Sequence, residues 1–190
     1  MEAHSLKADV LRGPRISLRA VEPRDYAELR RVELSGQLAF RWRHHGTHEP
    51  PEVYASSLWA DVLFNFLAFR TDNGEPFGIV SGYRPDMVGG HLCLAAARFE
   101  RGVGLSTEMV AAVAIAIDYA FIGWPFRKVY LETPEYNLGQ FLRDGRQSPF
   151  EVEARLREHV FLSGSYWDLV ILSVSRNRWS EIADTYRRFL

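Results

Sequence analysis

The alternation of hydrophobic and polar positions along the chain predicts strands interleaved with helices. Short segments that alternate, or that are apolar throughout, are typical of strands, and they lie at residues 16–21, 66–70, 77–83, 91–99, 128–132, 151–161 and 167–175. Segments with helical spacing, some of them opened by proline or acidic residues, are typical of helices, and they lie at residues 22–34, 50–63, 105–122, 137–143 and 177–190.

Two of these segments are expected at the centre of the fold. The helix at 105–122 is apolar almost all round, so it should be packed on every side. The strand at 91–99 hardly alternates, which is typical of burial on both faces. A helix connects it to the strand at 128–132, and such a crossover implies a parallel pair. We expect a single mixed α/β domain over residues 1–190, with a loose leader at 1–14 and an additional helix at 177–190.

Composition narrows the function classes. Hydrophobic residues make up 47% of the chain and charged residues 25%, as in an ordinary globular domain. The formal net charge of −1 gives no electrostatic case for binding nucleic acid or an anionic membrane. The longest apolar run, residues 109–117, is too short to cross a bilayer, and residues 1–12 have no signal-peptide core. The single cysteine, Cys93, excludes an internal disulfide and fits a reducing cytoplasm, and we expect a small core residue there.

The segment between the strand at 91–99 and the following helix is expected to bind an anion. Residues 101–106 read Arg-Gly-Val-Gly-Leu-Ser. Glycines let the backbone approach a ligand, and the first amides of a helix are unpaired and lie at the positive end of its dipole. A P-loop would need a lysine, which is absent, and a dinucleotide fingerprint would need a third glycine where Thr107 stands. A tight turn into the helix is the alternative.

The spacing Arg101-x-x-Gly104-x-Ser106 resembles the pyrophosphate-binding signature of the GNAT superfamily of N-acyltransferases. Further motifs, in the same order along the chain, resemble the branch that contains the RimJ and RimL ribosomal-protein acetyltransferases. They are Gly-Leu-Ser-Thr-Glu at 104–108, Asp118-Tyr119-Ala120-Phe121, Leu131-Glu132 followed by Asn137, Phe150-Glu151-Val152-Glu153 leading to Leu156-Arg157-Glu158-His159, Gly164-x-Tyr166-x-Asp168, and Trp179 near the last strand. The resemblance spans residues 16–179.

The resemblance implies an α+β fold, with a mixed and mostly antiparallel central sheet flanked by helices. Its one parallel pair, the strands at 91–99 and 128–132, splays apart. The pantetheine arm of acetyl-CoA, or of another acyl-CoA, would enter the gap and pair with the freed strand edge. The cofactor-binding residues implied by the family are Ala97, Arg98, Phe99, Arg101, Gly102, Val103, Gly104, Leu105, Ser106, Asn137 and Arg143. Asn137 equally suits the N-cap of the next helix.

The same resemblance suggests where catalytic groups stand. Relatives often carry a glutamate near the position of His91, and histidine is a suitable base near neutral pH, although His91 could instead cap its strand. Glu132 is a second candidate base, or a structural partner for an arginine. Many relatives have a thiol-protonating tyrosine at the position that corresponds to Asp144. Tyr136 is a candidate replacement or a packing residue, and positioning alone can also supply much of the rate.

The acceptor in this family usually enters past the first two helices, here near residues 40–48. Arg41, Trp42 and Arg43 are the predicted substrate-binding residues, because arginine and tryptophan suit aromatic or carboxylate-bearing groups. A solvated loop with a packed tryptophan is the alternative. This composition argues against polyamine acceptors, which would require acidic residues. The histidines at 44, 45 and 48 lack a nearby cysteine or well-spaced carboxylate, so we predict no metal site.

The sequence therefore predicts an acyl-CoA-dependent N-acyltransferase, with acetyl-CoA as the first choice of donor. The acceptor would be a primary amine of a small molecule or a protein N-terminus. The alternative is a GNAT-fold module with little turnover that binds CoA, or the acyl-pantetheine of an acyl carrier protein. We expect neither nucleic acid nor a membrane as partner, and a cytoplasmic protein. The last helix has an apolar stripe that either docks on its own domain or forms a homodimer; its members are Trp179, Ile182, Tyr186 and Phe189.

Overall fold

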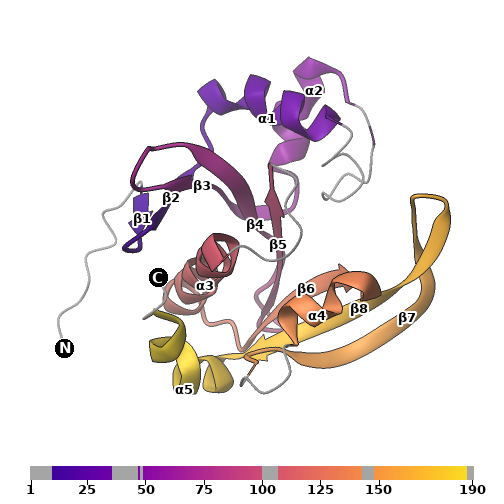
Figure 1. Ribbon diagram of the computed structural model, residues 1–190. Coiled ribbons are helices and arrows are strands. Elements are labelled where there is room, and N and C mark those ends of the chain that lie inside the picture. Colours follow the sequence, from indigo (N-terminus) through magenta and orange to yellow (C-terminus); the bar gives the residue numbers. More distant parts are fainter. Residues whose placement is uncertain (1–9, 36–46, 48, 100–106, 143–147, 188–190) are drawn as a thin grey trace.

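The computed structural model describes residues 10–35, 47, 49–99, 107–142 and 148–187. Their strands form one eight-stranded sheet with the order β1-β2-β3-β4-β5-β6-β8-β7 (Figure 1). The strands are β1 (Val10–Arg12), β2 (Ile16–Ala20), β3 (Val62–Arg70), β4 (Pro76–Asp86), β5 (His91–Arg98), β6 (Lys128–Pro134), β7 (Glu151–Leu162) and β8 (Ser165–Ser175). The helices are α1 (Tyr26–Leu34), α2 (Pro51–Leu58), α3 (Thr107–Gly123), α4 (Leu138–Phe141) and α5 (Arg176–Arg187), with 3-10 turns at Pro23–Asp25 and Glu135–Asn137.

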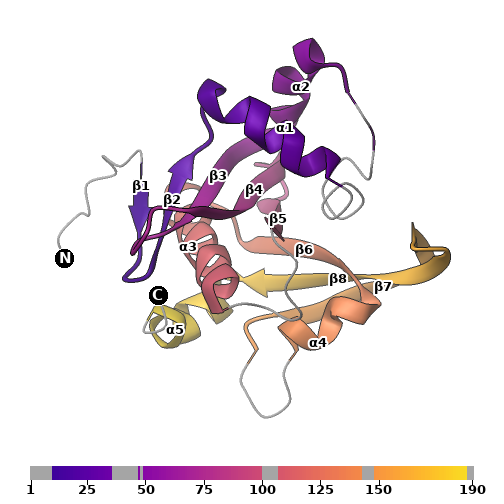
Figure 2. The same cartoon turned by 45° about the horizontal axis from the view of Figure 1, so that its top comes forward.

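Layers of helices cover both faces of this sheet. Helices α1 and α2 lie over one face, while α3 and α5 lie over the other (Figure 1 and Figure 2). Neighbouring strands are antiparallel except β5 and β6, which are parallel. The predicted α+β class and the parallel pair are thereby confirmed, and the strands predicted at 151–161 and 167–175 form the antiparallel hairpin of β7 and β8.

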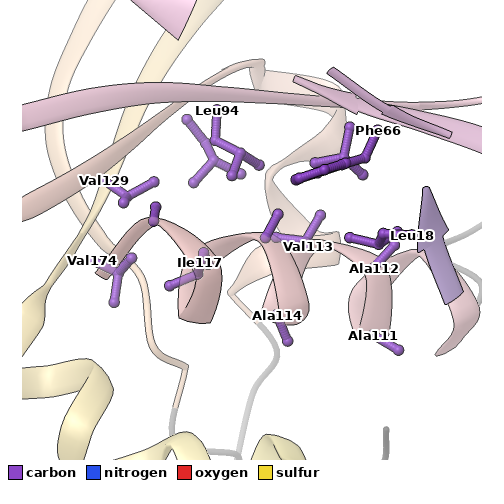
Figure 3. Close-up of a cluster of buried hydrophobic side chains, with 14 of the residues drawn as sticks. Leu18, Phe66, Leu94, Ala111, Ala112, Val113, Ala114, Ile117, Val129 and Val174 are labelled. Carbon is purple, nitrogen blue, oxygen red and sulfur yellow. The ribbon is translucent and has the colours of Figure 1, made fainter. Parts of the chain in front are cut away.

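Helix α3 forms the centre of the larger hydrophobic core. Most of its residues are buried, as expected for a helix that is apolar almost all round. Figure 3 shows this helix against the sheet, with Leu18, Phe66 and Leu94 from β2, β3 and β5. Val129 of β6 and Val174 of β8 belong to the same cluster. Strands β2 to β5 on one side of the parallel pair, and β6 and β8 on the other, therefore bury side chains against the same helix, α3.

A second, smaller core lies under α1 and α2 on the other face. Leu29 of α1, Leu58 of α2 and Ile79 of β4 are buried in it. Two buried polar side chains support the helices from below, because Asn65 Nδ2 donates to the Leu58 carbonyl at 2.8 Å and the Ser81 hydroxyl donates to Asn65 Oδ1. Buried polar groups are costly when unpaired, so this chain of bonds fixes the end of α2 over β3 and β4.

The predicted helix at 50–63 is shorter than expected. Helix α2 ends at Leu58, and the chain passes through Asp61, whose φ of 55° is left-handed, before β3 starts at Val62. The error has a physical reason, since the apolar run here fits a buried helix and a buried strand equally well. Pairing of β3 with β4 decides in favour of the strand.

The predicted leader at 1–14 also contains regular structure. Residues Val10–Arg12 form β1, which pairs antiparallel with β2. The N–H of Gly13 donates to the Ile16 carbonyl at 2.8 Å and closes the turn between them. A strand this short is stabilised by its partner rather than by its own pattern of side chains, which is why the sequence did not reveal it.

Helix α5 docks on its own domain. Trp179 and Ile182 are buried in the larger core, and Trp179 Nε1 donates to Asp118 Oδ1 of α3 at 2.7 Å. Trp179 therefore lies in the helix predicted at 177–190, shortly after β8 ends at Ser175, and docking on the same domain is confirmed for these two residues. The side chain of Tyr186 and residue Phe189 lie outside the described part of the chain. Among the described helices, none is long and apolar enough to cross a membrane.

Arg176, the first residue of α5, caps the end of α3. Its guanidinium donates to the carbonyl oxygens of Phe121, Trp124 and Phe126, the last at 2.7 Å. It also lies 5.0 Å from the centroid of the Phe121 ring. The last carbonyls of a helix have no partners within the helix, and a cation near them is favoured by the helix dipole.

Replacing this cap should destabilise the fold. Arg176→Met should lower the free energy of unfolding by about 2–4 kcal/mol, because buried carbonyls lose a charged donor. The control Arg178→Met removes the pair with Glu181, whose side chain is largely exposed, and should cost less than about 1 kcal/mol. Urea unfolding followed by tryptophan fluorescence measures both. Equal losses in the two variants would contradict the capping role.

Candidate functional site

The pairing between β5 and β6 stops part-way along both strands. The parallel ladder has three rungs, from His91–Lys128 to Cys93–Tyr130. Beyond the last rung, β5 continues along β4 and β6 continues along β8, but no described strand fills the space between them. The two strands therefore part after Cys93 and Tyr130, as the family resemblance implies.

Alternation along the two strands sorts their side chains onto the two faces. Leu92 and Leu94 of β5, like Val129 and Leu131 of β6, belong to the core around α3. The intervening side chains lie on the face that α1 and α2 cover, and they include His91, Cys93, Ala95, Ala97, Tyr130 and Glu132. Candidate catalytic residues from two strands are thus brought onto one face beside the point of parting.

His91 opens β5 at the closed end of the ladder. Its ring contacts that of Tyr130 edge-on, with 5.4 Å between centroids, and its Nδ1 lies 3.8 Å from Asp86 Oδ2. Asp86 accepts the backbone N–H groups of Gly89 and Val88, and these hydrogen bonds lower its pKa. The carboxylate beside His91 therefore holds the turn before β5, and His91 itself lies two rungs before the strands part.

Glu132 lies just past the point of parting, and an arginine reaches it from β4. Arg84 Nη1 donates to Glu132 Oε1 at 3.1 Å. Arg84 follows Tyr83 where the register of β4 is interrupted, and its φ of 48° is left-handed. Burial disfavours the charged guanidinium, but Glu132, Tyr83 and Cys93 together raise the pKa of Arg84. The interpretation of Glu132 as the partner of an arginine is confirmed, and its role as a base stays a prediction.

Cys93 lies on β5 between these two charged side chains. It is 8% exposed and pairs in register with Tyr83 on one side and Tyr130 on the other. Burial raises the pKa of its thiol, the Glu132 carboxylate raises it further, and Arg84 partly offsets both. The expectation of a small buried residue is confirmed, although two of its neighbours are charged.

Tyr136 and Asn137 follow β6 in the 3-10 turn before α4. The ring of Tyr136 packs edge-on against Trp167 of β8, with 5.0 Å between centroids. Asn137 occupies the N-cap position of α4, but its side chain makes no capping hydrogen bond. The packing contact expected as the alternative for Tyr136 is present, and Asn137 is at the N-cap as its alternative expects, without a capping hydrogen bond from its side chain.

The end of β5 contains three of the predicted cofactor-binding residues. Ala97 and Phe99 pack against the smaller core, and the Phe99 N–H donates to the Phe77 carbonyl at 3.0 Å. Arg98 Nε is buried without a hydrogen-bond partner, the one such side-chain nitrogen or oxygen in the described segments. Buried donors are nearly always satisfied, so an unpaired guanidinium N–H fits a ligand that carries oxygen acceptors.

Other predicted site residues lie outside the described part of the chain. They are Arg101, Gly102, Val103, Gly104, Leu105, Ser106 and Arg143 for the cofactor, and Arg41, Trp42 and Arg43 for the acceptor. Asp144 and the three histidines at 44, 45 and 48 lie outside it as well. Within the described ranges, no group of three or more His, Cys, Asp or Glu side chains is arranged to hold a metal ion.

Arg84 and Tyr130 lie at this site but were not among the residues predicted for it. Arg84 had a weak signal, because Pro85 follows it at the end of the predicted strand 77–83, and proline within a strand marks an edge or a bulge. Tyr130 had none, since its place beside Cys93 depends on the register of β5 against β6.

No family model and no curated protein sequence matches the chain. Solved structures match its fold. The spermidine N-acetyltransferase of Vibrio cholerae, in complex with CoA and spermine, aligns with a TM-score of 0.70 over 87% of this chain and 98% of its own, at 17% identity. A probable acetyltransferase of the GNAT family from Chromobacterium violaceum aligns with a TM-score of 0.67 over 90% of this chain and 88% of its own, at 18% identity. The chain has the GNAT acetyltransferase fold.

A further neighbour extends the match over more of the chain. A GCN5-related N-acetyltransferase from Brucella melitensis gives a TM-score of 0.69 over 94% of this chain and 84% of its own, at 16% identity. Identities this low establish the fold, and the RimJ and RimL branch stays a prediction.

The thiol of Cys93 should react slowly in the folded protein. Burial restricts access, and each unit by which the pKa rises lowers the thiolate fraction about tenfold near neutral pH. A chromogenic disulfide reagent should therefore label the native protein at least about tenfold more slowly than the urea-unfolded chain. Because this is the single cysteine, the signal has one source. Equal rates in the two states would contradict the described position of Cys93.

Proposed function

We propose that this protein is an acyl-CoA-dependent N-acyltransferase, with acetyl-CoA as the first choice of donor and a primary amine as acceptor. The observation that carries the proposal is the parting of β5 from β6 with the Glu132 carboxylate at its margin. A strand edge inside a sheet offers backbone donors and acceptors to a ligand, and a carboxylate beside it suits an ammonium group. One site would thus hold a donor and an acceptor together.

The residues at the end of β5 fit the donor. A pantetheine arm contains amides that can pair with the free edge of β5, and the small side chains of Ala95, Ala96 and Ala97 leave that edge approachable. Arg98 would give its unpaired Nε to an oxygen of the ligand. Residues 101–106 would offer backbone amides and a guanidinium to the pyrophosphate. The structure of the Vibrio cholerae enzyme contains CoA, which supports the same class of donor here.

The reaction would need little more than positioning and one proton acceptor. Bound acyl-CoA supplies the thioester, whose C–S bond breaks as the acceptor nitrogen forms its C–N bond. Glu132 would hold the ammonium group of the acceptor and take the proton that this nitrogen must lose. His91 lies two rungs behind the point of parting, and it would pass that proton toward solvent through water. Tyr136 is the candidate donor of a proton to the departing thiolate.

The described carboxylates favour an acceptor with a single ammonium group. The Vibrio cholerae enzyme binds spermine, a polyamine. In this chain, Glu33 accepts the hydroxyl of Tyr54 at 2.9 Å, and Glu49 accepts the hydroxyl of Ser57. Burial and Glu33 raise the pKa of Tyr54, so the phenol stays a donor. Because these carboxylates already have partners within the α1–α2 layer, a small amino compound or a protein N-terminus, as in the RimJ and RimL branch, suits the site better than a polyamine.

A second candidate is binding without turnover, of CoA or of the acyl-pantetheine on a carrier protein. The observation that favours it is Asp144, which stands where many relatives have a thiol-protonating tyrosine. This candidate predicts donor binding but no transfer to any amine, so one set of assays separates it from the first.

Calorimetric titration should show micromolar binding of acetyl-CoA and CoA and no binding of NAD. Arg98→Met should weaken CoA binding about tenfold, because a charged hydrogen bond contributes about 1.5–3 kcal/mol. Gly104→Trp should abolish it by blocking approach to the backbone amides. Arg178→Met is the control and should bind normally. Unchanged affinity in both site variants would exclude this donor site, and a wild type that binds no CoA would direct the search to carrier proteins.

Glu132→Gln should lower kcat by about a hundredfold or more, because it keeps the shape of the side chain but removes the proton acceptor. Its affinity for acetyl-CoA should stay unchanged. His91→Ala should cost less than about tenfold, since His91 stands behind the point of reaction. Release of CoA in the presence of a panel of primary amines measures both. A larger loss in His91→Ala than in Glu132→Gln would reverse the two roles.

A further inference from the structure

Arg84 has an unfavourable backbone conformation, and its side chain contributes little to the stability of the fold. Its φ of 48° lies in the left-handed region, which is strained for a residue that carries a Cβ. Its ion pair with Glu132 is partly in water, with side chains 60% and 31% exposed. Pairs this exposed contribute little to folding. The conformation of Arg84 therefore calls for an explanation other than stability.

The backbone around Arg84 is arranged to aim its side chain across β5. The register of β4 against β5 is interrupted between Tyr83 and Asp86, and such bulges redirect a side chain. The N–H of Arg84 donates to the Asp61 carbonyl at 2.8 Å, and Asp61 is itself left-handed with a φ of 55°. Two strained residues thus hold each other, and the guanidinium reaches from β4 to β6 over the strand between them.

We infer that Arg84 is a positioning residue that holds the Glu132 carboxylate at the margin of the parted strands, ready for the acceptor amine. The inference rests on the proposed function, because it assigns Arg84 a task through Glu132. The contact uses Oε1 of Glu132, which leaves Oε2 to the ammonium group. Without the guanidinium, a half-exposed glutamate would sample several rotamers, and a misplaced catalytic group costs rate.

The single cysteine reports on the carboxylate without any substrate. Glu132 raises the pKa of Cys93, so Glu132→Gln should lower it in a pH titration of thiolate absorbance. If Arg84 holds the carboxylate near β5, the carboxylate should lie farther from Cys93 once Arg84 is replaced. Glu132→Gln made in an R84M background should then shift the Cys93 pKa by roughly half as much as it does in the wild type, or less. The other titratable side chains on this face and the adjoining turns include Asp61, Tyr83, Asp86, His91, Lys128 and Tyr130, and they are unchanged in every variant.

Matched variants separate positioning from other effects. Methionine shares the left-handed strain of arginine, so R84M alters the charge and keeps the backbone cost. R84K keeps a cation within reach and should retain the full shift caused by Glu132→Gln. R178M removes an Arg–Glu pair on α5 and should retain it as well. If Glu132→Gln shifts the Cys93 pKa equally in the wild type and in R84M, the inference is overturned.

Kinetics supply the second test. With an amine that the protein acylates, R84M should lower kcat about tenfold or more and leave the KM for acetyl-CoA unchanged, and R84K should restore most of the rate. Adding R84M to E132Q should cause no further loss, because both act through one carboxylate. A further loss of the same size would overturn the inference.

The two proposals fail in different ways. A wild type that binds CoA but acylates no amine would end the proposed function, and the Cys93 titration would still decide whether Arg84 holds Glu132. An active E132Q variant with the expected Cys93 shifts would end the role of Glu132 in catalysis and leave the contact established.

Discussion

β5 and β6 pair for three rungs and then separate, and the rest of the molecule is arranged around that separation. Hydrophobic burial on one face keeps the two halves of the sheet together, since Leu94 of β5, Val129 of β6 and Val174 of β8 share one core with α3. This contact does not depend on hydrogen bonds between the strands. The sheet can therefore part along β5 and β6 while the two sides of the parting stay joined through one core.

Features set by neighbours in the sequence could be predicted, whereas features set by strand register could not. The apolar character of α3 identified a central helix, and its position between two apolar strands identified a parallel pair. The end of α2 was wrong because residues beyond Leu58 are apolar in a way that suits either element. The contact between Arg84 and Glu132 joins positions 48 residues apart and depends on a bulge in β4, for which Pro85 is a weak local signal that does not identify the partner.

The residues of the candidate site show the same difference between what neighbours in the sequence determine and what strand register determines. The sequence offered Glu132 either a catalytic role or an arginine partner, and the structure shows that partner on the face where the strands part. His91 was the first candidate base because relatives often carry a glutamate near its position, but the ladder puts it behind the point of parting. The sequence of one strand does not show at which residue the neighbouring strand separates from it. Arg98 was predicted from the resemblance, and its unpaired buried Nε is the physical property that such a role requires.

One outer edge of the sheet, that of β7, differs from the inner edge of β5 in a way that bears on function. The outer edge, β7, is interrupted in its pairing with β8 near Glu153 and again between Leu156 and Val160, and Glu158 within it has a left-handed φ of 49°. Bulges and charged side chains of this kind prevent other strands from pairing with an edge. The inner edge of β5 beyond Cys93 has no bulge against β4 and is lined by alanines. A regular strand edge inside the molecule, without bulges and with small side chains, can pair with the amides of an extended ligand as it would with another strand.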